Sequence, residues 1–393
     1  MPDFNRLKSL KDDIAIVGVG NTDYAADHAR ARAGELEENA YGYGARAFSR
    51  ALADCGIDRS EIDGLVAGPQ LAIERLGEII GVNPRWAAQG DAVNSIVTAT
   101  LALHCGMAEC VALIYGNDQR AVGTQYGGPQ AMGGENYLSY VYYQPWGLTS
   151  QGALYALMTR RYMELTGFRS EDLAEVSMAQ RRFAQLNPDA LMKKPLTLDG
   201  YMSSNFVCEP LRLFDYCLIN DGGVALIMTT ADRARRLKKK PVLISGIGRS
   251  DTNAQATSLW PRLIDFYHTS HRKAAEQVYE MAGVGPIDVD LLEVYDSFSS
   301  HIVFALEGFG FCREGEVAEF IRGKGIGPGG QLPVNTSGGH LSESYMQGWN
   351  HQVDAVRQLR GEAGARQVPG ARHAQYISDI AGKVITLMYR RSE

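Results

Sequence analysis

The sequence predicts an α/β fold built from two similar halves, and three observations carry this prediction. Residues 14–23 and 242–251 are short apolar runs containing Gly-x-Gly, which indicates a buried strand entering a tight turn. A stretch with helical spacing follows each run, at residues 40–55 and 272–281. A glycine, a short polar turn and a second apolar strand then come in the same order in both halves.

The elements of each half also indicate how the sheet is covered. The polar turn and second strand occupy residues 56–66 in the first half and 283–294 in the second. This alternation of helices and strands predicts βα units and a largely parallel sheet with helices on its faces. We expect the boundary near residues 238–240, so that the halves cover residues 1–240 and 241–393.

Composition limits the class of protein. The chain has 393 residues, 45% of them hydrophobic and 21% charged, which is typical of a globular protein with a large core. A net charge of -6 gives no sign of nucleic-acid binding. The polar start of the chain has no signal segment, and no apolar run suggests a membrane span. Six scattered cysteines without zinc-ligand spacing indicate reduced thiols and no metal site, so we expect a cytoplasmic protein.

Three segments carry motifs. Residues 210–225 contain Pro-Leu and, further on, Asp-Gly-Gly-Val-Ala, and residues 292–299 read Leu-Glu-Val-Tyr-Asp-Ser-Phe-Ser. Residues 335–348 read Asn-Thr-Ser-Gly-Gly-His-Leu-Ser-Glu-Ser-Tyr-Met-Gln-Gly. Together they resemble the thiolase superfamily, in particular the sterol-carrier-protein-type thiolases, often named lipid-transfer proteins. The resemblance implies duplicated βαβαβ halves in a layered α-β-α-β-α sandwich, with a loop domain inserted at about residues 118–205.

The nucleophile of a thiolase is missing. A thiolase needs a reactive cysteine at the start of a buried helix, where the helix dipole favours the thiolate. The corresponding helix is predicted at residues 95–104, and counting without gaps puts Gln89 at the nucleophile position. A small gap would instead put Gly90, Asp91 or Val93 there. No cysteine lies between Gln89 and Ser95. The covalent acyl-enzyme route therefore has no obvious nucleophile.

Other catalytic positions of the family also differ. Tyr345 stands where the family loop carries its catalytic histidine, and Tyr295 stands where the second motif has histidine or asparagine. Ser297 replaces the cysteine of that motif, and Asp379 replaces the cysteine near the C-terminus. This pattern resembles the steroid side-chain retro-aldolases, a thiolase-fold subgroup. These enzymes cleave a β-hydroxyacyl-CoA into a ketone and a short acyl-CoA, such as propionyl-CoA or acetyl-CoA, without a covalent intermediate.

Retro-aldol cleavage needs a base, an acid and hydrogen-bond donors for the thioester oxygen. We expect Tyr295 and Tyr345 to form the acid/base pair, with the two roles unassigned. A free phenol is a poor base at neutral pH, so a cation or hydrogen-bond donor must stabilise its anion. His340 is the nearest candidate in sequence. His340 and Asp379 are predicted catalytic residues, although a structural role fits each of them about equally well.

The remaining candidates concern the substrate. Gly338 and Gly339 are expected to permit close backbone approach or positive φ in the thioester-binding loop. Asp296 is expected to have a structural or supporting role, since an aspartate after a strand often caps a turn. Asp296, Ser297 and Gln89 are also counted in the predicted substrate- and CoA-binding site. Coenzyme A enters as the thioester of the substrate, and no bound cofactor is expected.

Two alternatives remain open: a thiolase with a displaced nucleophile, and a non-catalytic thiolase-fold subunit. The resemblance also implies a homodimer and a small partner protein with an OB fold and a zinc ribbon, which binds or positions the acyl-CoA. Residues 120–146 are rich in glycine and aromatic side chains. They fit either a pocket for a steroid or a subunit interface.

Overall fold

The computed structural model describes residues 9–35, 38–124, 143–148, 150–252, 254, 260–266, 268–380 and 382–393. Within the expected loop domain, residues 125–142 lie outside this part of the chain, and so does most of the aromatic-rich stretch. Among the described helices, none is long and apolar enough to cross a bilayer.

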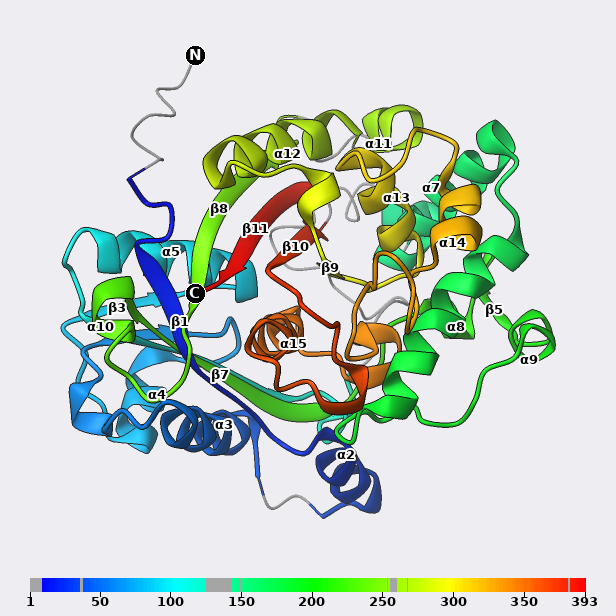
Figure 1. Ribbon diagram of the computed structural model, residues 1–393. Coiled ribbons are helices and arrows are strands. Elements are labelled where there is room, and N and C mark those ends of the chain that lie inside the picture. The colour runs from blue at the N-terminus through cyan, green and yellow to red at the C-terminus, as the bar shows by residue number, and fades with distance from the viewer. Residues whose placement is uncertain are drawn as a thin grey trace.

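Nine strands form one mixed sheet through the centre of the molecule (Figure 1). In order across the sheet they are β3 (Trp86–Gln89), β2 (Gly64–Ala67), β4 (Cys110–Asp118), β7 (Asp221–Thr230), β1 (Ile14–Asn21), β8 (Val242–Asp251), β11 (Lys383–Arg391), β10 (His373–Ile380) and β9 (Leu291–Val294). β1 and β8 meet through antiparallel pairing of Ala15 with Leu243 and Ile16 with Val242. The two strands that were recognised as similar in sequence therefore lie side by side.

Strand order and direction repeat on the two sides of this central pair. β1 runs antiparallel to β7, β7 antiparallel to β4, and β4 parallel to β2. β8 runs antiparallel to β11, β11 antiparallel to β10, and β10 parallel to β9. Only β3, which pairs in parallel with β2 at the edge, has no counterpart.

The prediction of a largely parallel sheet is wrong. Parallel pairing is confined to the outer strands, which are β4, β2 and β3 in one half and β10 and β9 in the other. Antiparallel pairs fill the centre. β11 returns directly after β10, with Ile380 paired to Lys383 in a hairpin. β7 enters between β1 and β4 after the inserted segment. Neither connection is the helical crossover that joins parallel strands. The alternation of helices and strands in the sequence therefore predicted more parallel strand pairs than the sheet has.

Helices lie in three layers about the two halves of the sheet. α5 (Ala92–His104) and α15 (Trp349–Arg360) contact each other and strands of both halves, so they form the inner layer. α3 (Ala40–Cys55) covers β1, β4 and β7 from outside, and α12 (His268–Ala282) covers β8 and β11. Figure 1 shows α15 between the two halves, α3 on one side and α12 on the other. The layered α-β-α-β-α sandwich is confirmed.

The glycines of the two similar strands allow α3 and α12 to pack directly on the sheet. A β-carbon at Gly18 would lie 2.6 Å from the Ala51 carbonyl oxygen of α3, and one at Gly246 would lie 2.6 Å from the Val278 oxygen of α12. Such distances leave no room for a side chain. The interpretation of Gly-x-Gly as the entry to a tight turn is wrong, because both glycine pairs lie within their strands, which continue to Asn21 and Asp251.

The segment between β4 and β7 lies against the second half. Its helices are α7 (Gln151–Thr166), α8 (Ser170–Leu186) and α9 (Leu198–Met202), followed by the hairpin β5 (Phe206–Cys208) and β6 (Leu211–Arg212). α7 and α8 share a hydrophobic core with α13 (Ser300–Gly308) and α14 (Val317–Lys324). The shorter helices α2 (Tyr24–Ala33), α4 (Ile73–Ile80), α10 (Ala231–Ala234) and α11 (Trp260–Asp265) complete the fold. α8 also contacts residues 339–343, so the insertion closes over the loop that carries the most specific motif.

Candidate functional site

Asn335 joins the end of β9 to the loop of residues 335–348. Its side-chain oxygen accepts a hydrogen bond of 2.6 Å from the Val294 N–H, and its amide donates one of 3.0 Å to the Val294 carbonyl. Asn335 has a φ of 50°, which asparagine tolerates better than most residues. This clamp fixes Tyr295 and Asp296, which follow β9, relative to the loop.

Gly338 and Gly339 are required by the shape of this loop. Their φ angles are 106° and 57°. A β-carbon on Gly338 would lie 2.8 Å from the Ala184 Cβ of α8. One on Gly339 would lie 2.7 Å from the Asn335 amide nitrogen and even closer to the Asp296 carboxylate. The predicted need for positive φ and close approach is confirmed, while the assignment of both glycines to substrate binding stays a prediction.

Tyr295 and Tyr345 meet at one point. Their hydroxyl oxygens are 3.0 Å apart, and either hydroxyl can be the donor. The two side chains are 5% and 6% exposed, so this hydrogen bond is made in a nearly water-free environment. The structure thus brings together two tyrosines that are 50 residues apart in the chain and that the sequence analysis assigned to catalytic positions.

Two asparagines that the sequence analysis missed hold Tyr345 in place. The Tyr345 N–H donates to the Asn220 side-chain oxygen at 2.7 Å, and the Asn117 amide donates to the Tyr345 carbonyl at 3.2 Å. Asn220 also donates to the Ser344 hydroxyl at 2.7 Å. Asn220 immediately precedes the Asp-Gly-Gly motif, which was the available signal. Asn117, at the end of β4, had none.

His340 packs beside both tyrosines but is not a cation. Its ring lies edge-on to Tyr295 and Tyr345, with centroid distances of 4.8 and 4.9 Å. Nε2 accepts a hydrogen bond of 2.9 Å from the Gly348 N–H, so the ring proton is on Nδ1. Burial, followed by the neighbouring His351, lowers the pKa of His340 well below its usual range. A neutral His340 does not supply the cation considered for a phenolate, and its catalytic assignment stays a prediction.

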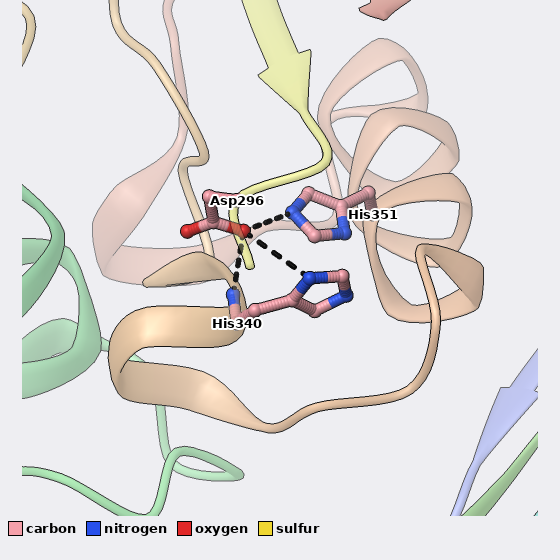
Figure 2. Close-up of side chains that lie close together, drawn as sticks. All are labelled: Asp296, His340 and His351. Atoms are coloured by element: carbon pink, nitrogen blue, oxygen red, sulfur yellow. Dashed lines mark hydrogen bonds and ion pairs between the residues drawn. The ribbon is translucent and has the colours of Figure 1, made fainter. Parts of the chain in front are cut away.

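The Asp296 carboxylate contacts the loop of residues 335–348 and His351 of α15. It accepts a hydrogen bond of 2.8 Å from the His340 N–H, and the same oxygen lies 3.1 Å from His351 Nε2 and 3.5 Å from His340 Nδ1. Figure 2 shows this oxygen directed toward both rings, with His351 reaching it from α15. The structural role expected for Asp296 agrees with this geometry, and its assignment to substrate binding stays a prediction. The sequence analysis missed His351, whose position on a helix after the motif gave no distinct signal.

These three side chains have the residue types of a metal site, and their potential ligand atoms lie within 4.8 Å of one another. The hydrogen bonds argue otherwise. A metal on His340 Nδ1 would move the ring proton to Nε2, where it would face the Gly348 N–H at 2.9 Å. Two donors would then point at each other. Asp296, His340 and His351 are best described as a hydrogen-bonded cluster that shapes the loop.

Asp379 is buried on β10 and pairs with a histidine of α12. Its carboxylate lies 3.1 Å from His271 Nε2, while His271 Nδ1 lies 3.2 Å from the Phe304 carbonyl. The Asp379 backbone oxygen accepts a hydrogen bond of 3.3 Å from the Tyr155 hydroxyl. Asp379 thus has a partner of its own in His271, and its catalytic assignment stays a prediction.

Gln89 is held by the loop after β2, and its assignment to the substrate site stays a prediction. It ends the edge strand β3, and its side-chain amide donates to three carbonyls of the loop after β2, the shortest bond being 2.9 Å to Leu71. This contact ties a surface loop to the sheet edge. The helix that follows, α5, starts at Ala92 with Asp91 as its N-cap. Ser297 is buried near the tyrosines, and its carbonyl accepts a hydrogen bond of 2.9 Å from the Cys217 N–H.

Because Cys217 contacts Ser297, it is the thiol that we considered for the alternative of a thiolase with a displaced nucleophile. Burial and the nearby Asp296 carboxylate raise the pKa of the Cys217 thiol to about 12. Reactive cysteines have lowered pKa values, so this environment is the opposite of one that forms a thiolate. Cys105, at the C-terminal end of α5, is exposed and lies at the wrong end of that helix for dipole activation.

Comparisons with known proteins agree with the geometry. A family model described as "Thiolase C-terminal domain-like" matches residues 252–385. The 17-hydroxy-3-oxo-4-pregnene-20-carboxyl-CoA lyase of Mycobacterium tuberculosis is 34% identical over 387 residues, which cover 93% of this chain and 95% of that protein. The chain belongs to the thiolase superfamily. Within this superfamily it groups with the steroid side-chain-cleaving aldolases.

Two further members of the superfamily support this grouping. A steroid side-chain-cleaving aldolase of Thermomonospora curvata is 32% identical over 375 residues, which cover 90% of this chain and 92% of that one. The solved structure of the Ltp2-ChsH2(DUF35) aldolase superposes with a TM-score of 0.85 and 27% identity, over 97% of this chain and 98% of that one. That structure contains an aldolase together with a DUF35 partner.

Proposed function

We propose that the chain catalyses retro-aldol cleavage of a β-hydroxyacyl-CoA that carries a steroid. The observation that carries this proposal is the 3.0 Å contact between the hydroxyls of Tyr295 and Tyr345, which occupy the acid/base positions of the thiolase fold. The M. tuberculosis relative gives the substrate class, a steroid with a 17-hydroxyl and a C20 carboxyl-CoA. The thioester is the substrate, and the reaction uses no separate cofactor.

The reaction conserves all atoms of the substrate. One tyrosyl oxygen takes the proton of the 17-hydroxyl, and the bond between C17 and C20 breaks. A ketone forms at C17, and the electron pair passes into the thioester as an enolate. A proton returned to C20 gives propionyl-CoA. Free CoA and water are neither consumed nor formed, so no acyl-enzyme is needed.

The tyrosine pair compensates for the neutral His340. When one phenol becomes an anion, the other can donate a hydrogen bond to it across 3.0 Å, which stabilises the anion. Their near-complete burial strengthens this interaction because little water competes for either oxygen. The proton can then move between the two oxygens as the cycle requires.

Purified chain, with and without the partner, should be incubated with 17-hydroxy-3-oxo-4-pregnene-20-carboxyl-CoA. The products are followed by mass spectrometry, together with the intact mass of the protein. We expect the 17-ketone and propionyl-CoA in equal amounts, with no acylated protein. Tyr295→Phe and Tyr345→Phe should each lower turnover at least about 100-fold.

Tyr279→Phe is the matched control. Its hydroxyl is bonded to the Phe309 carbonyl and the Gln375 side chain at 3.1 Å each, so this variant loses a tyrosyl hydroxyl outside the proposed centre. It should keep wild-type turnover. Normal turnover by both site variants would remove the tyrosines from the mechanism, and an acylated cysteine would favour the thiolase alternative. Failure of the wild type with its partner would favour a non-catalytic subunit.

For the assembly, we propose a homodimer that binds a small DUF35 protein with an OB fold and a zinc ribbon. The similar aldolase structure, which contains a DUF35 chain, supports the second part. Light scattering on the chain alone and mixed with such a partner tests both parts. A monomer that gains no mass on mixing would reject them.

A further inference from the structure

His301 is a buried side chain that the proposed mechanism does not yet use. It is the second residue of α13 and only 1% exposed. Its ring stacks on Tyr155 with centroids 4.2 Å apart, and lies 5.6 Å from Phe298 and 6.0 Å from Tyr295. His301 therefore belongs to a cluster of aromatic rings that includes Tyr295.

Neither ring nitrogen of His301 has a hydrogen-bond partner within the part of the chain that the structure describes. Other buried histidines nearby are held: His271 lies 3.1 Å from Asp379, and His351 lies 3.1 Å from Asp296. Leaving a buried polar group unpaired opposes folding, so native structures keep few such groups without a functional reason. A ring with two uncommitted nitrogens, its centroid 6.0 Å from that of Tyr295, has such a reason if the substrate completes its hydrogen bonds.

The His301 ring is also uncharged at neutral pH, which suits a hydrogen-bond donor to an oxygen that gains negative charge. Burial lowers the pKa of His301 to about 4, against the opposing influence of Asp379 and Asp296. At neutral pH the imidazole is uncharged, with one nitrogen a donor and the other an acceptor. A neutral imidazole can donate to an oxygen that gains negative charge during the reaction and does not lose its proton to it.

We propose that His301 donates a hydrogen bond to the thioester oxygen of the substrate and stabilises the enolate formed on carbon–carbon cleavage. The inference rests on the proposed retro-aldol function and adds a third catalytic residue to the tyrosine pair. Tyr295 and Tyr345 handle the protons of the 17-hydroxyl and C20. His301 stabilises the charge that the thioester receives. No bond to His301 forms or breaks, and its proton stays on the ring.

His301→Phe keeps a planar ring for stacking on Tyr155 and removes both nitrogens. Its turnover number should fall at least about 100-fold, as for loss of an oxyanion donor, with a much smaller change in KM. Its melting temperature should be equal to or above that of the wild type, because an unpaired polar group leaves the core. A histidine with a structural role would behave in the opposite way and lose stability on substitution.

Two further variants sharpen the test. His301→Gln keeps a hydrogen-bond donor, so its turnover number should be at least about tenfold higher than that of His301→Phe. Ser300→Ala removes a buried hydroxyl, one residue away, that has no hydrogen-bond partner among the described residues, and should keep wild-type turnover. Wild-type turnover by His301→Phe, or a loss of activity that follows a fall in melting temperature, would overturn the inference and leave the tyrosine mechanism standing.

Binding of propionyl-CoA separates the inference from the proposed function. Calorimetry should show about fivefold weaker binding to His301→Phe than to the wild type, the effect of about one lost hydrogen bond. If the wild type with its partner cleaves nothing, the proposed function fails. The binding of propionyl-CoA still tests whether His301 contacts the thioester. Weaker binding then supports His301 as a thioester contact, and equal binding rejects it.

Discussion

The carboxylate of Asp296 occupies the space in which a β-carbon on residue 339 would stand. Gly339, with its φ of 57°, lets the loop backbone close on this carboxylate, and the adjacent His340 N–H then donates to it at 2.8 Å. The orientation of His340, and with it the packing around both tyrosines, depends on this approach.

Gly339→Ala should therefore be strongly destabilising. We expect a loss of about 2–4 kcal/mol in the free energy of unfolding, from positive-φ strain plus overpacking, together with loss of activity. Gly361→Ala is the control, since Gly361 also has positive φ but nothing within 4 Å of its added β-carbon. It should cost about 1–2 kcal/mol and keep activity. Equal losses in urea unfolding would contradict the role of the Asp296 contact.

The two tyrosyl hydroxyls should act as one unit. Because they share a hydrogen bond, removing either one disables the pair, and removing both should cost little more. The double variant Tyr295→Phe/Tyr345→Phe should fall within about tenfold of the slower single variant. Single-turnover rates measure this directly. Multiplicative losses would show that each tyrosine works independently of the other.

The stability of the protein should respond to the neutral state of His301. Its pKa of about 4 lies below the value of about 6.5 in the unfolded chain, so its contribution is complete above pH 6.5 and is lost as pH falls toward 4. Asp379, Asp296 and His271 are the charged or titratable groups acting on it.

The wild type should thus lose stability relative to His301→Phe over this pH range, by up to about 3 kcal/mol. Urea unfolding at half-unit intervals from pH 4 to 8 gives the difference between the two proteins. Above pH 6.5 that difference should be constant. A difference that stays flat down to pH 4 would mean that His301 is charged in the folded state or exposed to solvent.

Cys217 should be inert at neutral pH. With the thiol pKa raised to about 12, alkylation by iodoacetamide at pH 7.5 should be far slower than at the exposed Cys105, as peptide mass spectrometry would show. Cys217→Ala should keep retro-aldol turnover. Rapid labelling of Cys217, or loss of turnover in the alanine variant, would revive the displaced-nucleophile alternative.

Much of the framework could be predicted from local patterns. The helix at 40–55 has the predicted limits, since it is a long amphipathic run with clear ends, whereas the strand at 242–251 continues through the Gly-x-Gly where a turn was expected. Gly338 and Gly339 were recognised because only glycine combines positive φ with such close packing. Sheet direction could not be predicted, because the connection that leads to β7 contains helices but joins it to antiparallel neighbours, so a helix between two strands did not mean a parallel pair.

The sequence by itself determined which chemical groups the site contains: two tyrosines at family catalytic positions and no cysteine at the helix start. Only the tertiary structure decided what state those groups are in. The hydrogen bond from Gly348 to His340, eight residues apart, makes that ring an acceptor at Nε2. The burial of His301 leaves it neutral. Charge and tautomer depend on desolvation and on partners brought together by folding, and neither is encoded in a residue's neighbours along the chain.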